Sequence, residues 1–155
     1  MLNELFSAFD GLAERHGLEK IKTIGDAYMV AGGIPQPRPD HAEAVAEMAL
    51  DMRTELGRLS ESLGLGLELR IGVASGPVIA GVIGRQKLIY DLWGDTVNIA
   101  SRMESNGLPG EIQVNEAAYE RLRHRFRLEP RGEIEVKGRG RLRAWFLKTR
   151  ITEPA

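Results

Sequence analysis

The chain has no cysteine, which excludes disulfide bonds and permits a cytoplasmic setting. It also has almost no net charge, since 21 basic residues face 22 acidic ones, so we expect no nucleic-acid partner and no membrane contact. The longest weakly polar stretch, residues 71–84, is interrupted by glycine, serine and proline and is too short to cross a bilayer. The start lacks a basic segment followed by an apolar one, so no signal peptide is expected. If a longer parent protein is membrane-anchored, we expect the anchor outside this chain.

The length of 155 residues suits one domain with its own core, expected over residues 1–150, followed by a short tail at 151–155. The hydrophobic content of 43% and the charged content of 28% are typical of globular proteins.

Hydrophobic periodicity and turn residues predict that helices and strands interleave along the chain. Helices are expected over residues 2–16 and 40–63, from residue 95, and over 115–124, with Asp40, Asp95 and Asn115 as their caps. Glu43 would complete a capping-box-like pair with Asp40. Strands are expected over 18–24, 27–32, 67–75, 87–93 and 111–114, and within 126–148, where Gly132 and the Gly138/Gly140 pair would separate them. This order predicts an α+β sandwich.

The run Tyr-Asp-Leu-Trp-Gly-Asp-Thr-Val-Asn-Ile-Ala-Ser-Arg-Met-Glu-Ser at residues 90–105 is the most informative part of the sequence. It places Asp91 at the end of an apolar stretch, and it places Asn98 and Arg102 four residues apart on one helical face. A carboxylate, an amide and a permanent cation near one turn suit a nucleotide. The run resembles the signature of the class III nucleotidyl cyclases, and the run Glu-Lys-Ile-Lys-Thr-Ile-Gly-Asp-Ala-Tyr-Met at 19–29 provides a second match.

The resemblance implies a fold and a reaction. The fold would be a ferredoxin-like, palm-type sandwich of a mainly antiparallel sheet with helices. The reaction would be metal-assisted attack of the ribose 3′-oxygen of ATP on the α-phosphorus, which yields cyclic AMP and pyrophosphate in signal transduction. The cofactor would be Mg²⁺ or Mn²⁺, with two ions in the family.

Three residues are the candidates for metal binding and for alignment of the reacting groups. Asp26, at the expected tip of a hairpin, offers a hard oxygen ligand, although aspartate after glycine is also common in turns. Arg102 is the candidate for stabilising charge on the transferring phosphate, and Asn98 for orienting the ribose. A solvent-facing pair on a surface helix is the structural alternative.

The hydrogen-bonding sense of Lys22 and Asp91 favours adenine. Lys22 can only donate a hydrogen bond and ionised Asp91 can only accept one, which complements the edge of adenine. With guanine, a donor would face a donor and an acceptor would face an acceptor. The family typically has Lys and Asp here in adenylyl cyclases, and Glu and Cys in guanylyl cyclases. A simple salt bridge between neighbouring strands is the alternative. The two interpretations are compatible, because the residues can pair with each other while the site is empty.

The resemblance also implies a triphosphate contact and a shared active site. Lys137, in Val-Lys-Gly-Arg-Gly, matches the family position that contacts the triphosphate. A head-to-tail homodimer would pair Asp26 of one protomer with the nucleotide-binding residues of its partner (Lys22, Asp91, Asn98, Arg102 and Lys137). We expect a regulatory domain on the N-terminal side in the parent protein.

The sequence departs from the family pattern at its start. The family has a first metal aspartate on a strand that precedes the helix expected at 2–16, and this chain shows no such segment. We therefore expect a truncated form with weak or no activity. A non-catalytic module that binds nucleotide or a partner is one alternative, and a guanylyl cyclase is another. The arginine-rich stretch 121–131 is expected to be a solvated face rather than an anion site.

Overall fold

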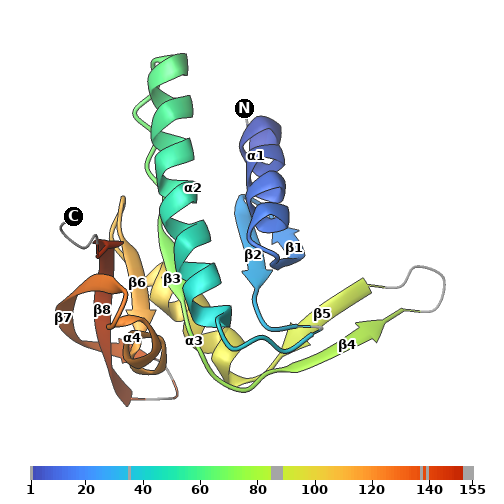
Figure 1. Cartoon of the computed structure of the whole chain (residues 1–155), viewed down its shortest axis with the longest axis vertical. Helices are drawn as coiled ribbons and strands as arrows, with labels where there is room; N and C mark the ends of the chain where they lie inside the picture. Colours follow the sequence, from blue (N-terminus) through green and yellow to red (C-terminus); the bar gives the residue numbers. More distant parts are fainter. Residues whose placement is uncertain (1, 35, 85–88, 137, 139, 152–155) are drawn as a thin grey trace. The chain divides into compact units, whose positions relative to one another are not determined.

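The computed structural model describes residues 2–34, 36–84, 89–136, 138 and 140–151, with four helices and eight strands in these ranges (Figure 1). The chain forms two compact units whose segments interleave in the sequence. The first unit comprises residues 1–67 and 78–94, and the second comprises residues 68–77 and 95–155. The expected α+β class is confirmed.

The first unit begins with α1 (Leu2–Arg15), which confirms the helix expected over 2–16. Its buried side chains, Leu5, Phe9 and Ala13, recur every four residues and so form one face. Gly17, with a φ of 67°, follows the helix in the left-handed conformation that glycine adopts readily at a helix end.

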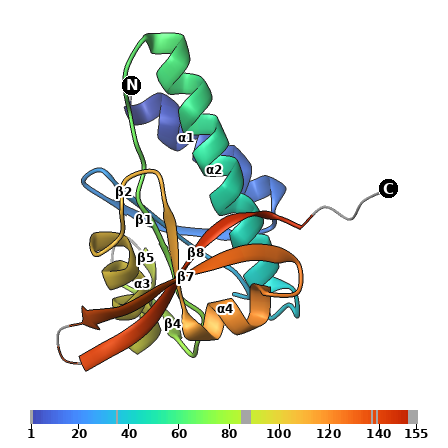
Figure 2. The same cartoon turned by 90° about the vertical axis from the view of Figure 1, so that its left-hand side faces the viewer.

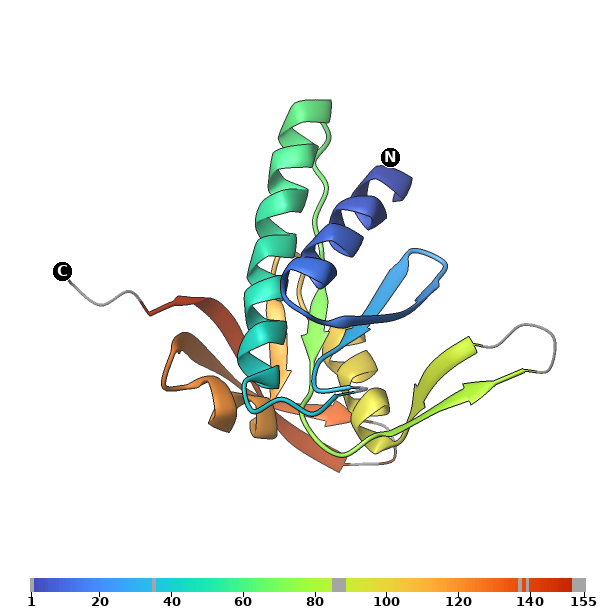
Figure 3. The same cartoon turned by 45° about the vertical axis from the view of Figure 1, so that its right-hand side comes forward.

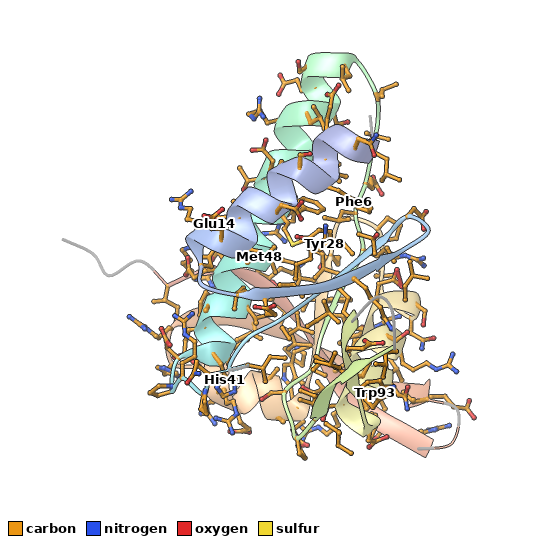
Figure 4. All side chains as sticks on the ribbon, turned by 90° about the vertical axis from the view of Figure 1, so that its right-hand side faces the viewer. Phe6, Glu14, Tyr28, His41, Met48 and Trp93 are labelled. Carbon is orange, nitrogen blue, oxygen red and sulfur yellow. The ribbon has the colours of Figure 1, made fainter. Side chains whose placement is uncertain are left out.

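The hairpin of β1 (Glu19–Ile24) and β2 (Ala27–Ala31) is also confirmed, and Ile24 pairs with Ala27 across its tip (Figure 3). Tyr28 fixes this hairpin to α1. Its hydroxyl donates to Asp10 at 2.7 Å, and its ring lies 5.4 Å from that of Phe6 (Figure 4). The strand that carries Lys22 therefore has a firm support within its own unit.

The long helix α2 (His41–Leu63) has the expected extent, but its expected cap is wrong. The Asp40 side chain makes no capping hydrogen bond, because its carboxylate accepts from the Arg38 guanidinium at 2.7 and 2.9 Å. The buried face of α2 includes Met48, Ala49, Met52 and Leu56, while Val45 and Leu59 are half-buried.

A second hairpin, β4 (Ile79–Ile83) with β5 (Ile89–Trp93), completes the first unit. Strand β5 matches the strand predicted over 87–93, of which residues 87 and 88 lie outside the described residues, whereas β4 was not predicted. Strand β4 is apolar but its hydrophobic residues do not alternate with polar ones, and Ile79, Val82 and Ile83 are exposed. The sequence therefore shows neither the two-residue period of a half-buried strand nor the pattern of a fully buried one.

The second unit contains a four-stranded sheet in the order β3-β6-β8-β7 (Figure 1). Figure 2 shows the long strands β7 and β8 of this sheet. Its strands are β3 (Ile71–Val73), β6 (Ile112–Asn115), β7 (Phe126–Val136) and β8 (Gly140–Arg150), and its helices are α3 (Asp95–Ser105) and α4 (Glu116–Leu122). Strands β3 and β6 are parallel, and the other two pairs are antiparallel. Met103 of α3 packs in a core cluster with Ile134, Val136 and Ala144.

Asn115 caps α4 as expected, because its side-chain oxygen accepts from the Ala118 N–H at 3.0 Å. Two other expectations for this unit were wrong. The strand predicted over 67–75 is confined to 71–73. Gly132 does not separate two strands but lies in a register shift inside the continuous β7, with a φ of 110°. Among the described residues, no helix is long and apolar enough to cross a membrane.

Candidate nucleotide site

Lys22 and Asp91 come from different hairpins of the first unit and form a close ion pair. The Lys22 ammonium donates to one Asp91 oxygen at 2.8 Å, and the Leu92 backbone N–H donates to the other oxygen at 2.8 Å. Asp91 is only 7% exposed, whereas the Lys22 side chain is about one-third exposed. The pair therefore has a fixed carboxylate and a more accessible cation.

The same contacts keep the Asp91 carboxyl ionised. The hydrogen bond from Lys22, followed by that from the Leu92 N–H, holds the pKa of Asp91 below its usual value. An ionised carboxylate can accept but not donate. The environment of Asp91 thus agrees with the expectation from the sequence that this side chain acts only as a hydrogen-bond acceptor.

Asp26 lies at the tip of the β1–β2 hairpin and is exposed. Its carboxylate oxygen atoms are hard ligands on a two-residue turn, so the residue could fill one position in the shell of a divalent cation. The described residues contain no cluster of three or more His, Cys, Asp or Glu side chains that could hold a metal ion.

Asn98 and Arg102 lie on α3 in the second unit, four residues apart as on one helical face, and both are exposed. Met103, with 0% exposure, anchors the opposite side of this helix in the core. Asp95 is the first residue of α3, where a carboxylate interacts favourably with the helix dipole. Lys137 lies outside the described residues, so the structure does not place this predicted triphosphate contact.

The arginine-rich stretch divides into two kinds of residue. Arg121, Arg123, Arg125 and Arg127 are exposed, which agrees with the predicted solvated face. Arg131 is different, because its half-buried guanidinium donates to the Asn106 carbonyl and to the Gln113 side chain.

Sequence reasoning missed Gln113 and Arg131 as candidates near the signature helix. Gln113 is 0% exposed in the centre of β6 and donates to the Met103 carbonyl at 3.0 Å. The available signal was an amide side chain between two apolar residues, Ile112 and Val114, since a buried polar side chain needs a specific partner. Its partners could not be deduced without the sheet register.

Comparison with known proteins identifies the family. Residues 1–149 match the family model described as the adenylate and guanylate cyclase catalytic domain. An adenylate cyclase of Mycobacterium bovis is 53% identical over 146 residues, which cover 94% of this chain and 33% of that protein. The human guanylate cyclase soluble subunit beta-2 is 47% identical over 149 residues, which cover 95% of this chain and 24% of that protein.

A solved structure agrees with these matches. The guanylate cyclase domain of RhGC from Catenaria anguillulae, in complex with GTP, superposes with a TM-score of 0.91 and 39% identity, covering 97% of this chain and 82% of that one. The chain therefore belongs to the class III adenylate and guanylate cyclase catalytic domains. It spans about a third of the length of the mycobacterial relative.

Proposed function

We propose that this domain cyclises ATP to 3′,5′-cyclic AMP and pyrophosphate, as an adenylyl cyclase in signal transduction. The observation that carries the choice of ATP is the Lys22–Asp91 pair, with its 2.8 Å contact and its ionised carboxylate. Membership of the cyclase family supports the class of reaction, and the Lys22–Asp91 pair supports adenine as the base of the substrate.

The direction of the hydrogen bonds that Lys22 and Asp91 can form favours adenine. Adenine presents an acceptor at N1 and a donor at its 6-amino group, so Lys22 can donate to the first and Asp91 can accept from the second. Guanine presents the reverse pattern at these two positions. Each mismatched and desolvated group would cost about 1–3 kcal/mol, which is enough to discriminate between the two bases.

The exposed face of α3 is proposed to serve the sugar and the phosphates. Arg102 would stabilise the charge that develops on the α-phosphate, because its guanidinium stays protonated and can bind two oxygens. Asn98, one helical turn away, would orient the ribose for attack by its 3′-oxygen. Lys137 is proposed, from the resemblance alone, to contact the triphosphate.

Asp26 is proposed as a ligand for Mg²⁺ or Mn²⁺. Such an ion, when bound, would neutralise phosphate charge and favour ionisation of the 3′-hydroxyl. Mg²⁺ is commonly held by one or two carboxylates together with substrate phosphates and water, so one protein ligand is compatible with binding to the nucleotide complex. Since Asp26 is the single carboxylate that we assign to the ion, we expect weak turnover by this chain alone.

We further propose a homodimer with shared sites, and a regulatory domain attached in the parent protein. The resemblance assigns the metal aspartate to one protomer and the base-recognition residues to the other. In this arrangement Asp26 and Lys22 would serve two different sites. This explains how two residues four positions apart on one hairpin can have separate roles. A twofold axis would generate both sites.

The direct test is product identification. The purified chain is incubated with ATP or GTP in separate reactions with Mg²⁺ or Mn²⁺, and cyclic AMP and cyclic GMP are quantified. Cyclic AMP formation that is lost in Arg102→Ala but kept in Ser101→Ala supports the proposal. Cyclic GMP as the main product contradicts the assignment of the base.

A guanylyl cyclase is the second candidate, and the comparisons give it a specific basis. The human relative is named a guanylate cyclase subunit, and the solved Catenaria domain is described in complex with GTP. A non-catalytic nucleotide-binding or dimerisation module is the third, because Asp26 is the single metal ligand that we assign. Nucleotide binding without any cyclic product would support this third candidate.

A further inference from the structure

The C-terminal turn of α3 is fixed by two polar side chains of its own unit. Gln113 on β6 donates from its amide nitrogen to the Met103 carbonyl at 3.0 Å, and its amide oxygen accepts from Arg131 on β7. The Arg131 guanidinium also donates to the Asn106 carbonyl just beyond the helix. The two side chains thus bind backbone atoms on both sides of the last turn.

These contacts close a ring of hydrogen bonds that includes the backbone of Arg102. The Asn106 N–H donates to the Arg102 carbonyl at 2.9 Å, so the residue held by Arg131 is itself bonded to Arg102. Helix ends leave their last carbonyls without partners, and a cation near them is favourable for both hydrogen bonding and the helix dipole. Arg131 meets both needs, and it also lies over the Phe146 ring, 5.5 Å from its centroid.

Gly72 fixes the same helix from the adjacent strand. It is the direct register partner of Gln113 in the parallel β3–β6 pair. A Cβ atom at this position would lie 2.2 Å from the Glu104 nitrogen and 2.4 Å from the Ala100 oxygen, so only glycine allows this approach. Backbone contact at Gly72 sets the distance between helix and sheet, and the Gln113–Arg131 pair holds the turn.

We propose that Gly72, Gln113 and Arg131 form a positioning cradle for Arg102, and this inference rests on the proposed cyclase function. The cradle holds residues 100–106 from the sheet side, whereas Arg102 and Asn98 are exposed. Arg102 can stabilise a developing phosphate charge only from one position, and a misplacement of about 1 Å can reduce turnover about 10²-fold. None of the three residues needs to touch the substrate.

A purely structural role would also explain why buried Gln113 is hydrogen-bonded, so the test must separate the two roles. The full chain is compared with Arg131→Met, Gln113→Met and the conservative Arg131→Lys. Arg127→Met is the matched control, because Arg127 lies on the same strand, is exposed, and forms no ion pair among the described residues. Residue-resolved amide hydrogen exchange and steady-state cyclisation kinetics are measured on all variants.

Arg131→Met is expected to accelerate exchange at Asn106 and Gly107 about tenfold, while the first turn of α3 and the strands of the sheet stay within about twofold. We expect kcat to fall about 10²-fold with KM changed by less than about threefold. Arg131→Lys should recover part of both, since an ammonium can still reach one carbonyl. Arg127→Met should behave like the unmodified chain.

The cradle is wrong if exchange at Asn106 and Gly107 is unchanged, or if it rises equally throughout the unit. It is also wrong if Arg127→Met lowers kcat as much as Arg131→Met does. A chain that makes no cyclic nucleotide contradicts the proposed function instead. In that case exchange at Asn106, whose N–H binds the Arg102 carbonyl, still decides whether Arg131 holds this backbone.

Discussion

Lys22 and Asp91 lie 69 residues apart in the sequence and on separate hairpins, yet their charged atoms meet at 2.8 Å. The contact joins β1 to β5 and stays within one compact unit. It presents a donor and an acceptor side by side, and it gives the base-recognition proposal a definite geometry.

The pair makes the stability of the fold depend on pH. The pKa of Asp91 is lowered in the folded chain, so its stabilisation is fully present above the unfolded pKa, about 3.9, and is lost as pH falls through the lower folded pKa. Asp91→Asn should therefore flatten the dependence of the unfolding free energy on pH below about 5. Urea titrations between pH 2 and 7 measure this slope.

Asp26→Asn is the control for that experiment, because Asp26 is exposed and forms no ion pair among the described residues. It should leave the slope nearly unchanged. Equal slopes for Asp91→Asn and the unmodified chain would contradict the contribution of the pair.

Two residues that the sequence marks equally as helix caps should differ in their effect on stability. Asn115→Ala removes the hydrogen bond to the Ala118 N–H and two contacts with Ser75, so we expect a loss of about 1–2 kcal/mol in unfolding free energy. Asp40→Ala removes only the exposed pairing with Arg38, because the Asp40 side chain caps nothing, and should have a much smaller effect. Chemical denaturation of both variants measures the difference, and equal losses would refute the assignment of the two caps.

Alanine at two glycines should act in opposite directions. Gly72→Ala puts a Cβ atom 2.2 Å from the Glu104 nitrogen, so the helix must move, at a cost of about 1–3 kcal/mol. Gly57→Ala, in the exposed middle of α2 with open space around it, should stabilise by about 0.5–1 kcal/mol. Thermal melts of both variants suffice, and a stabilising Gly72→Ala would show that the close approach is absent.

Removal of the Arg102 guanidinium should affect chemistry rather than folding. Arg102→Ala replaces an exposed side chain, so the melting temperature should change little, while kcat should fall about 10²–10³-fold if the group stabilises the transition state. Ser101→Ala, the exposed neighbour, is the control. Comparable kcat values for the two variants would remove Arg102 from the proposed mechanism.

Local signals predicted the elements well where the pattern was periodic. Helix α1, the β1–β2 hairpin and the Asn115 cap follow from four-residue spacing, a Gly-Asp turn and a helix-starting Asn. Strand β4 was missed because its apolar residues are exposed and do not alternate. Asp40 was misassigned as a cap because Arg38, two residues earlier, competes for its carboxylate.

The site was predictable to the extent that its residues cluster in sequence motifs. The resemblance identified Lys22, Asp91, Asn98 and Arg102 as candidates, and the structure adds the contact between the first two. Gln113 and Arg131 could not be found in this way. Their roles depend on the register of β6 and β7 beside α3, which is a property of the tertiary structure.

The central claim is that Lys22 and Asp91 read adenine, and exchange of both residues tests it most directly. Initial rates with ATP and with GTP are compared for the unmodified chain and for the double variant Lys22→Glu/Asp91→Cys, with Mn²⁺ present. We predict that the unmodified chain prefers ATP and that the double variant loses or reverses this preference. A double variant that keeps the same preference for ATP would contradict the account.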